Sequence, residues 1–298
     1  MSERMPEATA HQSGRSGPVG PPGHDDEAAG AGKAGERELA PPPKGPLDPN
    51  DGKSLTLDVD GATWARIPVR TELFARGDDL EAKVASHVEP MLPLVQDEPR
   101  LASGLEQRWY VVVSEKIVAI SQGRSYFTWE INPGLPARVL ARFVHRTPYG
   151  IGLGSPWTMQ LAVNEAGLPR IVAAAAASLV GKLLGRRGWF YRVAGHRVNA
   201  IDGPTPYSAY PSNVSAKLPP KDPAAVAARV STALRAGLPE ALRATFGGTV
   251  VIDSNDLGRD VLGQDTDRDD AFFAALFADN PFGQGRQQTP LAVCLRLS

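Results

Sequence analysis

Hydrophobic and polar residues alternate where the patterned part of the chain begins. The alternation covers residues 55–59, stops at Asp60-Gly61 and resumes over 64–69. Side chains of a strand point to opposite faces with a period of two, and Asp-Gly is a preferred two-residue hairpin turn. We therefore predict a β-hairpin over residues 55–69.

The spacing becomes helical after Gly77. Apolar residues recur at 80, 84, 88 and 91, Asp78 is available as the N-cap, and prolines at 90 and 93 end the pattern. The segment that follows, to about residue 107, has the composition of a loop. Further helices are expected after Ser155-Pro156, over 171–184 (apolar enough to be buried on most sides), over 222–236 and over 267–278.

Short apolar runs predict the remaining strands. Residues 109–113 and 116–120 are expected to form a strand pair or one long buried strand, and further strands are expected over 190–193, 198–201, 249–252 and 290–297. Strands that alternate with helices, without a long repeat, favour an α/β fold, with α+β as the alternative. We expect one domain with a mixed sheet over residues 54–298.

Residues 1–53 lack any hydrophobic period and are rich in glycine, proline, alanine, serine and charge. Ordering a chain costs roughly 1 to 2 kcal/mol per residue in backbone entropy, which this composition cannot offset by burial. The segment is predicted to be a disordered tail.

Composition narrows the class of protein. The net charge of −1 argues against nucleic acid or an anionic membrane as partner. The single cysteine, Cys294, is expected to be a core thiol because it lies in the last apolar run. We find no signal-peptide pattern and no apolar run of roughly 18 residues, so a cytoplasmic location is the expectation.

Acidic residues follow two predicted strands. Asp253, Asn255 and Asp256 come directly after the strand at 249–252, and Asp202 follows the run at 198–201. Ligands often bind just past the carboxyl ends of strands, and such oxygen ligands suit Mg²⁺ or Mn²⁺. Helix capping and a hydrogen-bonded Asx turn are the alternative for 253–256.

A glycine-dense turn is a candidate phosphate site. It contains Gly150, Gly152, Gly154 and Ser155, and a predicted helix follows. Backbone N–H groups at a helix N-terminus attract anions, although no Walker motif is present and an ordinary loop is the alternative. Lys116 and Arg124 are candidate phosphate-binding cations, with surface cations as the alternative.

Motifs along residues 66–262 resemble those of the coenzyme F-420-0:L-glutamate (γ-glutamyl) ligases, in the same order. The tail over 279–290 resembles a divergent bacterial branch of that group. The motifs are Gly77-Asp78-Asp79-Leu80, Val113 to Val118 running to Gly123-Arg124, Ile201-Asp202, Ser212-Asn213-Val214, Leu218 to Pro223, and Gly258-Arg259.

The resemblance implies a GTP-dependent amide ligase, with ATP as the alternative nucleotide. A carboxylate substrate is phosphorylated, the amine of an amino acid such as L-glutamate attacks the acyl phosphate, and Mg²⁺ or Mn²⁺ neutralises the phosphates. Asp202 matches a metal-binding aspartate of the family. The second metal-binding pair matches Asn255-Asp256 or, after a two-residue shift, Asp253-Ser254. The resemblance also adds Arg259 to the candidate phosphate-binding residues Lys116 and Arg124, and it suggests a homodimer.

Departures from the family pattern leave the substrate open. Ile120 stands where the family has a lysine and Gln122 where it has a glutamate. The Pro-Trp-Arg that follows Gly-Arg in the family is replaced by residues 260–262. The alternative function is therefore a non-catalytic nucleotide- or metabolite-binding protein with the same fold.

Overall fold

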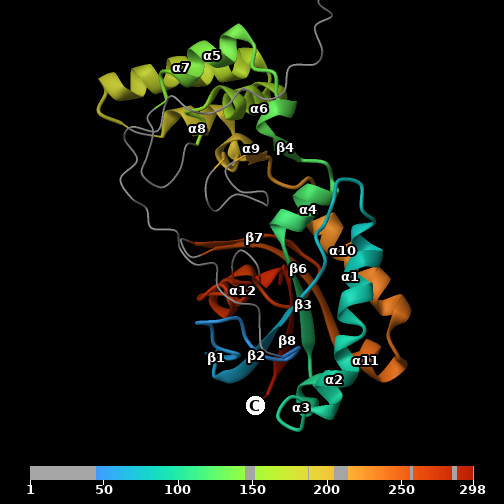
Figure 1. Cartoon of the computed structure of the whole chain (residues 1–298). Coiled ribbons are helices and arrows are strands. Elements are labelled where there is room, and N and C mark those ends of the chain that lie inside the picture. The colour runs from blue at the N-terminus through green and yellow to red at the C-terminus, as the bar shows by residue number, and fades with distance from the viewer. Residues whose placement is uncertain are drawn as a thin grey trace, which may run out of the picture. The chain divides into compact units, whose positions relative to one another are not determined.

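A six-stranded mixed sheet forms the centre of this α/β protein, which confirms the expected fold class (Figure 1). The structure is a computed structural model that describes residues 45–144, 152–186, 188–204, 214–255, 258–283 and 287–297. The strand order is β1-β2-β8-β3-β6-β7, and β4 and β5 pair separately. The strands are β1 (Thr56–Val59), β2 (Ala62–Val69), β3 (Trp109–Ser114), β4 (Ser125–Phe127), β5 (Ser215–Lys217), β6 (Phe246–Ser254), β7 (Arg259–Gln264) and β8 (Leu291–Arg296).

The predicted hairpin is confirmed by the pairing of β1 and β2. Val59 pairs with Ala62, so Asp60 and Gly61 form a two-residue loop with φ of 52° and 73°. Positive φ at both positions matches the right-handed twist of the strands, and aspartate and glycine tolerate it. Local turn chemistry is sufficient to fix this element.

The sheet combines parallel and antiparallel pairs. β3 and β6 run parallel, whereas the other neighbouring strands of the described sheet are antiparallel. A parallel pair needs a long crossover connection, and this one contains everything between residues 114 and 246. The carboxyl ends of β3 and β6 therefore lie at one edge of the sheet.

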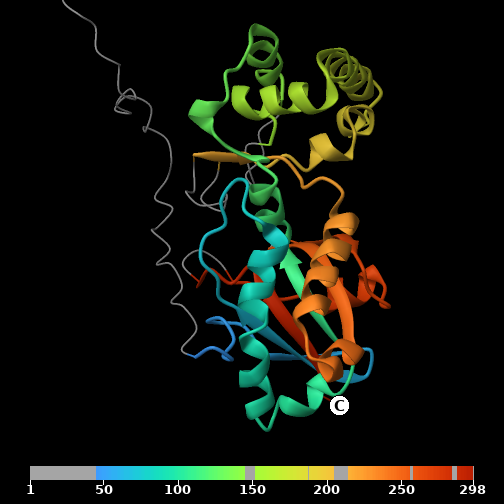
Figure 2. The same cartoon turned by 90° about the vertical axis from the view of Figure 1, so that its right-hand side faces the viewer.

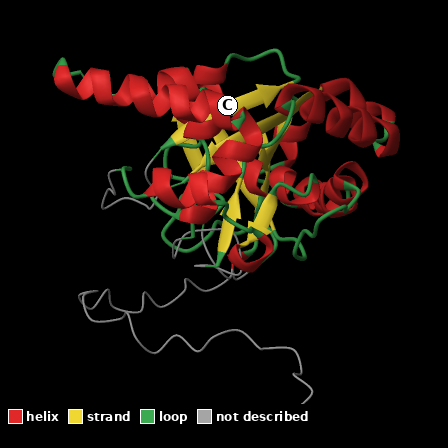
Figure 3. Ribbon diagram, turned by 90° about the horizontal axis from the view of Figure 1, so that it is seen from above, coloured by secondary structure: helices red, strands yellow, loops and turns green. Residues whose placement is uncertain are grey.

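Helices cover both faces of the sheet (Figures 2 and 3). Val111 and Val113 of β3 pack into one hydrophobic cluster, and Tyr110 and Val112 pack into the other, as a period of two requires. α12 (Asp270–Leu276) supplies the second cluster, and helices from the other side supply the first. Those are α1 (Leu80–Val88), α2 (Met91–Asp97), α3 (Ala102–Leu105), α10 (Pro223–Gly237) and α11 (Glu240–Thr245).

The first helical region differs in detail from its prediction. Asp79, not Asp78, caps α1 by accepting from the Ala82 N–H at 3.0 Å, whereas Asp78 accepts from Lys83. The segment to residue 107 is not a loop, because it forms α2 and α3. Pro93 fits in the first turn of α2, where backbone N–H groups have no intrahelical partner.

Three predicted strands are helices, which is the main error of the sequence prediction. Residues 116–120 lie in α4 (Glu115–Ser121), and the runs at 190–193 and 198–201 fall in or after α8 (Trp189–Ala194) and α9 (His196–Asn199). A short apolar run does not distinguish a buried strand from a helix by its period. Ser114 caps α4, and Gly188 and Gly195, with φ of 84° and 101°, mark the starts of the other two.

The crossover contains a set of helices around a third hydrophobic cluster, and we call residues 128–204 the insert. α6 begins as predicted, with Ser155 as its N-cap and Pro156 at its first position. The helices of the insert are η1 (Thr128–Glu130), α5 (Leu135–Ala141), α6 (Pro156–Ala166), α7 (Leu168–Leu183), α8 and α9.

The expectation that residues 171–184 are buried on most sides is wrong. Ile171, Ala174 and Gly181 of α7 are buried, but the opposite side of the helix is exposed. No single helix in the described ranges is long and apolar enough to cross a membrane. α6 and α7 together meet those criteria, but they are bent by 115° at the break between them.

Cys294 lies inside the sheet, as predicted. It occupies β8, pairs with Arg66 and Tyr110 of the flanking strands, and is completely buried. Burial raises the pKa of the Cys294 thiol to about 12. The thiol is therefore protonated and shielded in the folded protein.

Candidate functional site

The carboxyl ends of β3 and β6 place two acidic residues beside each other. Ser114 of β3 is in register with Ile252 of β6, so Glu115 and Asp253 are the next residues at this edge. Ser114 also caps α4, which starts the chain away from the sheet at this point. Parallel strands thus bring together side chains that are far apart in the sequence.

Lys217 joins Glu115 to Asp202. Its ammonium group forms an ion pair with the Glu115 carboxylate, and both side chains are only 4% exposed. The same Nζ lies 3.2 Å from Asp202 Oδ2, whose side chain is 55% exposed. Two backbone hydrogen bonds of 2.9 Å between Asp202 and Lys217 hold this arrangement.

The charges of these residues are coupled, and we call Glu115, Lys217, Asp202 and Asp253 the Lys217 cluster. Burial raises the pKa of Glu115, and the charges of Asp253 and Asp202 raise it further against the effect of Lys217. Burial alone lowers the pKa of Lys217, but the three carboxylates outweigh it and raise that pKa. Both shifts favour the protonated form: burial is the larger cause for Glu115, and the neighbouring carboxylates are the cause for Lys217.

The predicted metal ligands only partly come together. Asp202 and Asp253 both interact with Lys217, and Asn255 donates from Nδ2 to Asp253 Oδ1 at 3.4 Å. Asn255 Oδ1 also accepts from Gly258 N at 3.0 Å, a local side-chain-to-backbone bond that spans three residues, one more than in an Asx turn. Asp256 lies outside the described residues. Within the described ranges, no group of three or more histidine, cysteine, aspartate or glutamate side chains is arranged to hold a metal ion.

Arg124 does not lie free at the site. It is 6% exposed, its Nε donates to the Pro219 carbonyl at 2.5 Å, and its Nη2 donates to Glu165 at 3.0 Å. A buried arginine paired in this way fixes α6 of the insert to the segment after β5. By contrast, Lys116 lies in the first turn of α4 beside Glu115 and is half-buried.

The glycine turn belongs to the insert rather than to the Lys217 cluster. Ser155 Oγ accepts from Thr158 N at 3.1 Å, so the Ser155 side chain caps the N-terminus of α6. Gly154 lines a half-open pocket of about 310 Å³ together with Arg138 and Arg142. Gly152 has a φ of 50°, and Gly150 lies outside the described residues. The positive side chains here suit an anion, but this pocket and the acidic cluster are formed by different elements.

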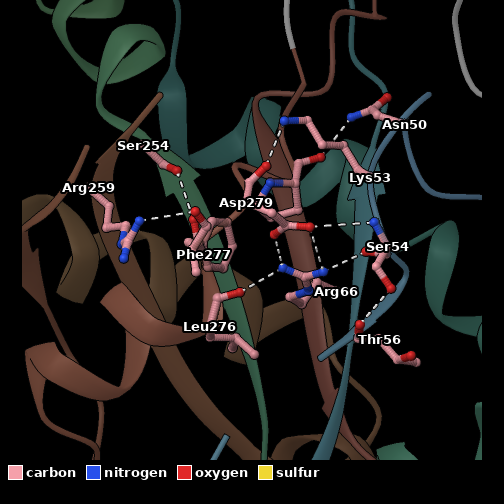
Figure 4. Close-up of polar contacts among 12 residues, drawn as sticks. Asn50, Lys53, Ser54, Thr56, Arg66, Ser254, Arg259, Leu276, Phe277 and Asp279 are labelled. Carbon is pink, nitrogen blue, oxygen red and sulfur yellow. Dashed lines mark hydrogen bonds and ion pairs between the residues drawn. The ribbon is translucent and has the colours of Figure 1, made fainter. Parts of the chain in front are cut away.

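Arg259 contacts a helix end at the edge of the sheet. Its Nη1 donates to the Ala278 carbonyl at 3.1 Å, and it pairs with Ser254 at the end of β6 (Figure 4). The same view shows the buried Arg66 held by Asp279, by the Leu276 carbonyl at 2.9 Å and by the Ser54 carbonyl at 2.6 Å. Arg66 thereby ties β2 to the end of α12, which is a structural role.

Sequence reasoning missed the two most buried members of the cluster. Glu115 directly follows the apolar strand β3, and Asp253 lies at the end of β6 after its apolar run, so the rule that selected Asp253 could have selected Glu115. The prediction of a strand over 116–120 hid that strand end. Lys217 gave little signal, because a lysine in a three-residue strand is usually exposed.

Comparisons with known proteins do not identify the chain: no family model matches it, and no curated protein matches it.

Proposed function

We propose that the protein is a metal- and nucleotide-dependent amide ligase, with the Lys217 cluster at its reaction centre. The resemblance to γ-glutamyl ligases motivates the reaction class: a carboxylate is phosphorylated by GTP or ATP, and an amino-acid amine displaces the phosphate. L-glutamate is the first amino acid to test, and the fold would be of that ligase type. The observation that carries the proposal is the cluster of acids at the carboxyl ends of two parallel strands.

The donor set of the cluster is compatible with Mg²⁺ or Mn²⁺. Three carboxyl groups face one ammonium group, so the cluster has an excess of negative charge that a divalent cation would reduce. Mg²⁺ is often held by one or two carboxylates together with substrate phosphates, so a cage of three protein carboxylates is not required. Asp202 and Asp253 are the residues we expect to hold it, and Asn255, whose amide nitrogen now faces Asp253, would join them only by turning its side-chain oxygen toward the cluster. When bound, the ion would neutralise phosphate oxygens.

The protein's own residues would position the reactants. Lys217 is fixed by Glu115 and stays charged, so it orients Asp202 at the exposed side of the cluster. Lys116, on the first turn of α4, is placed to neutralise a phosphate group as a point charge. Lys116 is on α4, which follows β3 directly, whereas Lys217 is on β5 of the separate two-stranded sheet.

Release of nucleoside diphosphate tests the proposal. Purified protein with Mn²⁺ or Mg²⁺ and GTP or ATP should release diphosphate only when a carboxylate and an amine acceptor are both present. Asp202→Asn and Asp253→Asn should each lower the rate by at least about 100-fold, the scale of one lost electrostatic group at a reaction centre. Asp97→Asn, at an exposed helix end, is the matched control. No nucleotide-induced thermal shift, together with parental behaviour of Asp202→Asn, would rule the ligase out.

A binding protein without turnover is the second candidate, and the contacts of Arg124 and Gln122 favour it. Arg124 is committed to Glu165 and Pro219, and Gln122 exchanges two hydrogen bonds of 2.9 and 2.7 Å with the Lys221 backbone. The hydrogen bonds of both side chains therefore stabilise the fold, at positions where the γ-glutamyl ligases have residues of the site region. This candidate predicts saturable nucleotide binding without diphosphate release, so one titration with product analysis separates the two.

A further inference from the structure

The outer face of α7 is apolar although nothing in the described part of the chain covers it. Exposed apolar residues recur every three or four positions along one side of the helix, opposite the buried Ile171, Ala174 and Gly181. Leu179 is 62% exposed and Leu183 is 81% exposed. We define the outer face as Leu168, Val172, Ala176, Leu179 and Leu183. A helix that is apolar on both sides is expected to contact something on both.

The outer face lies within the most basic part of the chain. Residues 135–199 contain nine lysine or arginine residues and one acidic residue, Glu165, although the whole chain has a net charge of −1. The rest of the chain therefore carries the compensating acid. The expectation of no membrane partner rested on the net charge of the whole chain, which does not reveal that residues 135–199 are basic and the remaining residues together are acidic.

Several of these cations are adjacent in the sequence to exposed apolar residues. Lys182 precedes Leu183, Arg186 follows the end of α7, and Arg142 precedes Phe143, which is 75% exposed. Arg142, Lys182 and Arg186 are exposed, and none of them forms an ion pair within the described residues. Figures 1 and 2 both draw α5 and α7 at the same end of the insert. Lys182 and Arg186 thus lie at the C-terminal end of the apolar face, without an ion pair among the described residues.

We propose that the outer face of α7, with the cations Lys182 and Arg186 at its C-terminal end, docks on an anionic lipid surface. Aliphatic side chains would enter the boundary between headgroups and acyl chains while lysine and arginine contact lipid phosphates and carboxylates. Charge complementarity and the apolar stripe together select this partner. The proposal is independent of the ligase proposal, because no residue of the Lys217 cluster takes part.

Two other partners fit the observations less well. Nucleic acid would use the cations but offers nothing to five aliphatic positions in one stripe. A symmetric contact between two copies would cover the stripe but would place the same basic segment on both sides of the interface. The experiment distinguishes all three partners.

Vesicle flotation with the full-length protein tests the proposal. The protein should float with vesicles of phosphatidylcholine and phosphatidylserine and remain in solution with phosphatidylcholine alone, and added salt should weaken the binding. The charge variant Lys182→Glu/Arg186→Glu should bind at least about 30-fold more weakly, since each cation near an anionic surface contributes about a factor of five. Leu179→Ser/Leu183→Ser should bind at least about 10-fold more weakly.

Matched controls carry the same changes outside the insert. Arg70→Glu/Arg100→Glu reverses two exposed cations, and Leu73→Ser/Leu94→Ser removes two exposed leucines. All four double variants alter exposed residues, and circular dichroism would verify that each is folded. The controls should float like the parent protein.

Three results would overturn the proposal. The first is absence of binding to phosphatidylserine vesicles, or binding that both insert variants retain. The second is binding of RNA or DNA that the charge variant loses and the leucine variant keeps. The third is self-association, measured by analytical ultracentrifugation, that the leucine variant abolishes while vesicle binding is unchanged.

Discussion

The six-stranded sheet and the insert are both rich in apolar side chains, but they cover them differently. The sheet buries its aromatic and branched residues in two clusters, one on each face. The insert buries a third cluster but leaves the outer face of α7 and Phe143 exposed. An apolar sequence therefore does not by itself say what will cover it. Helices cover both faces of a sheet that lies between them. A set of helices outside that sheet has one side that no other layer covers.

The Lys217 cluster lies where these two regions meet. Glu115 and Asp253 come from strand ends of the sheet, whereas Asp202 comes from the end of the insert and Lys217 from β5 just after it. Substitutions in either region should therefore alter the geometry of the Lys217 cluster, and substitutions in the cluster should alter the stability of the contact between the sheet and the insert. The following predictions test this comparison, in order of decreasing expected effect.

Removal of a buried ring that packs against the sheet should have the largest effect. Phe273→Ala should lower the free energy of unfolding by about 4 kcal/mol, because Phe273 is fully buried against Tyr110 and Phe272. Urea denaturation measures the change. Phe143→Ala makes the same chemical change at an exposed position of the insert and should cost less than about 0.5 kcal/mol. Similar costs for the two variants would contradict the difference in burial.

Loss of the buried ammonium group should come next. Lys217→Met should lower the free energy of unfolding by about 3 kcal/mol, because it leaves Glu115 buried without its counter-charge. Adding Glu115→Gln should restore part of that loss, which a double-mutant cycle in urea measures. Lys116→Met, at the half-buried neighbour, is the control and should have a small effect. An additive double variant would show that the two charges are not coupled.

The ion pair between Arg66 of β2 and Asp279, just after α12, should make the free energy of unfolding depend on pH. Burial opposes it, but the hydrogen bonds and charge of Arg66 lower the pKa of Asp279 below its ordinary value. The unfolded chain thus binds a proton at higher pH than the folded protein does. This stabilisation is present above about pH 4 and is lost as pH falls below it.

Asp279→Asn should remove that dependence. Allowing for solvent at the partly exposed carboxylate, the contribution should be about 1 kcal/mol or less. Urea denaturation between neutral and acidic pH should show a shallower loss for Asp279→Asn than for the parent protein or for the exposed control Asp260→Asn. Parallel curves for all three proteins would contradict the assignment.

The smallest effect is expected on the outer face of α7. Leu179→Ala and Leu183→Ala should each change the free energy of unfolding by no more than about 0.5 kcal/mol, because the side chains are already in solvent. Thermal or urea denaturation of the full chain measures this. A cost above about 1.5 kcal/mol would mean that the chain itself covers the face, and the contrast between the two regions would then disappear.

Local signals predicted the elements that local chemistry decides. The Asp60-Gly61 hairpin, the Ser155 cap of α6, α10 and the closing strand with Cys294 follow from turn residues, caps and periodicity. Periodicity failed for short apolar runs, as in α4, α8 and α9, because a buried helix of one or two turns has the same composition as a buried strand. In those places tertiary packing, not propensity, selected the element.

Local patterns were enough to predict the hairpin, the main helices, the buried cysteine and the strand that ends near Asp253, because each depends on neighbours only a few positions away. The pairing of Glu115 with Lys217 at the centre of the acidic cluster, and the exposure of one side of α7, could be seen only in the folded chain. Both outcomes depend on which distant segments meet. The parallel pairing of β3 with β6 creates the first, and the position of α7 on the outside of the insert creates the second.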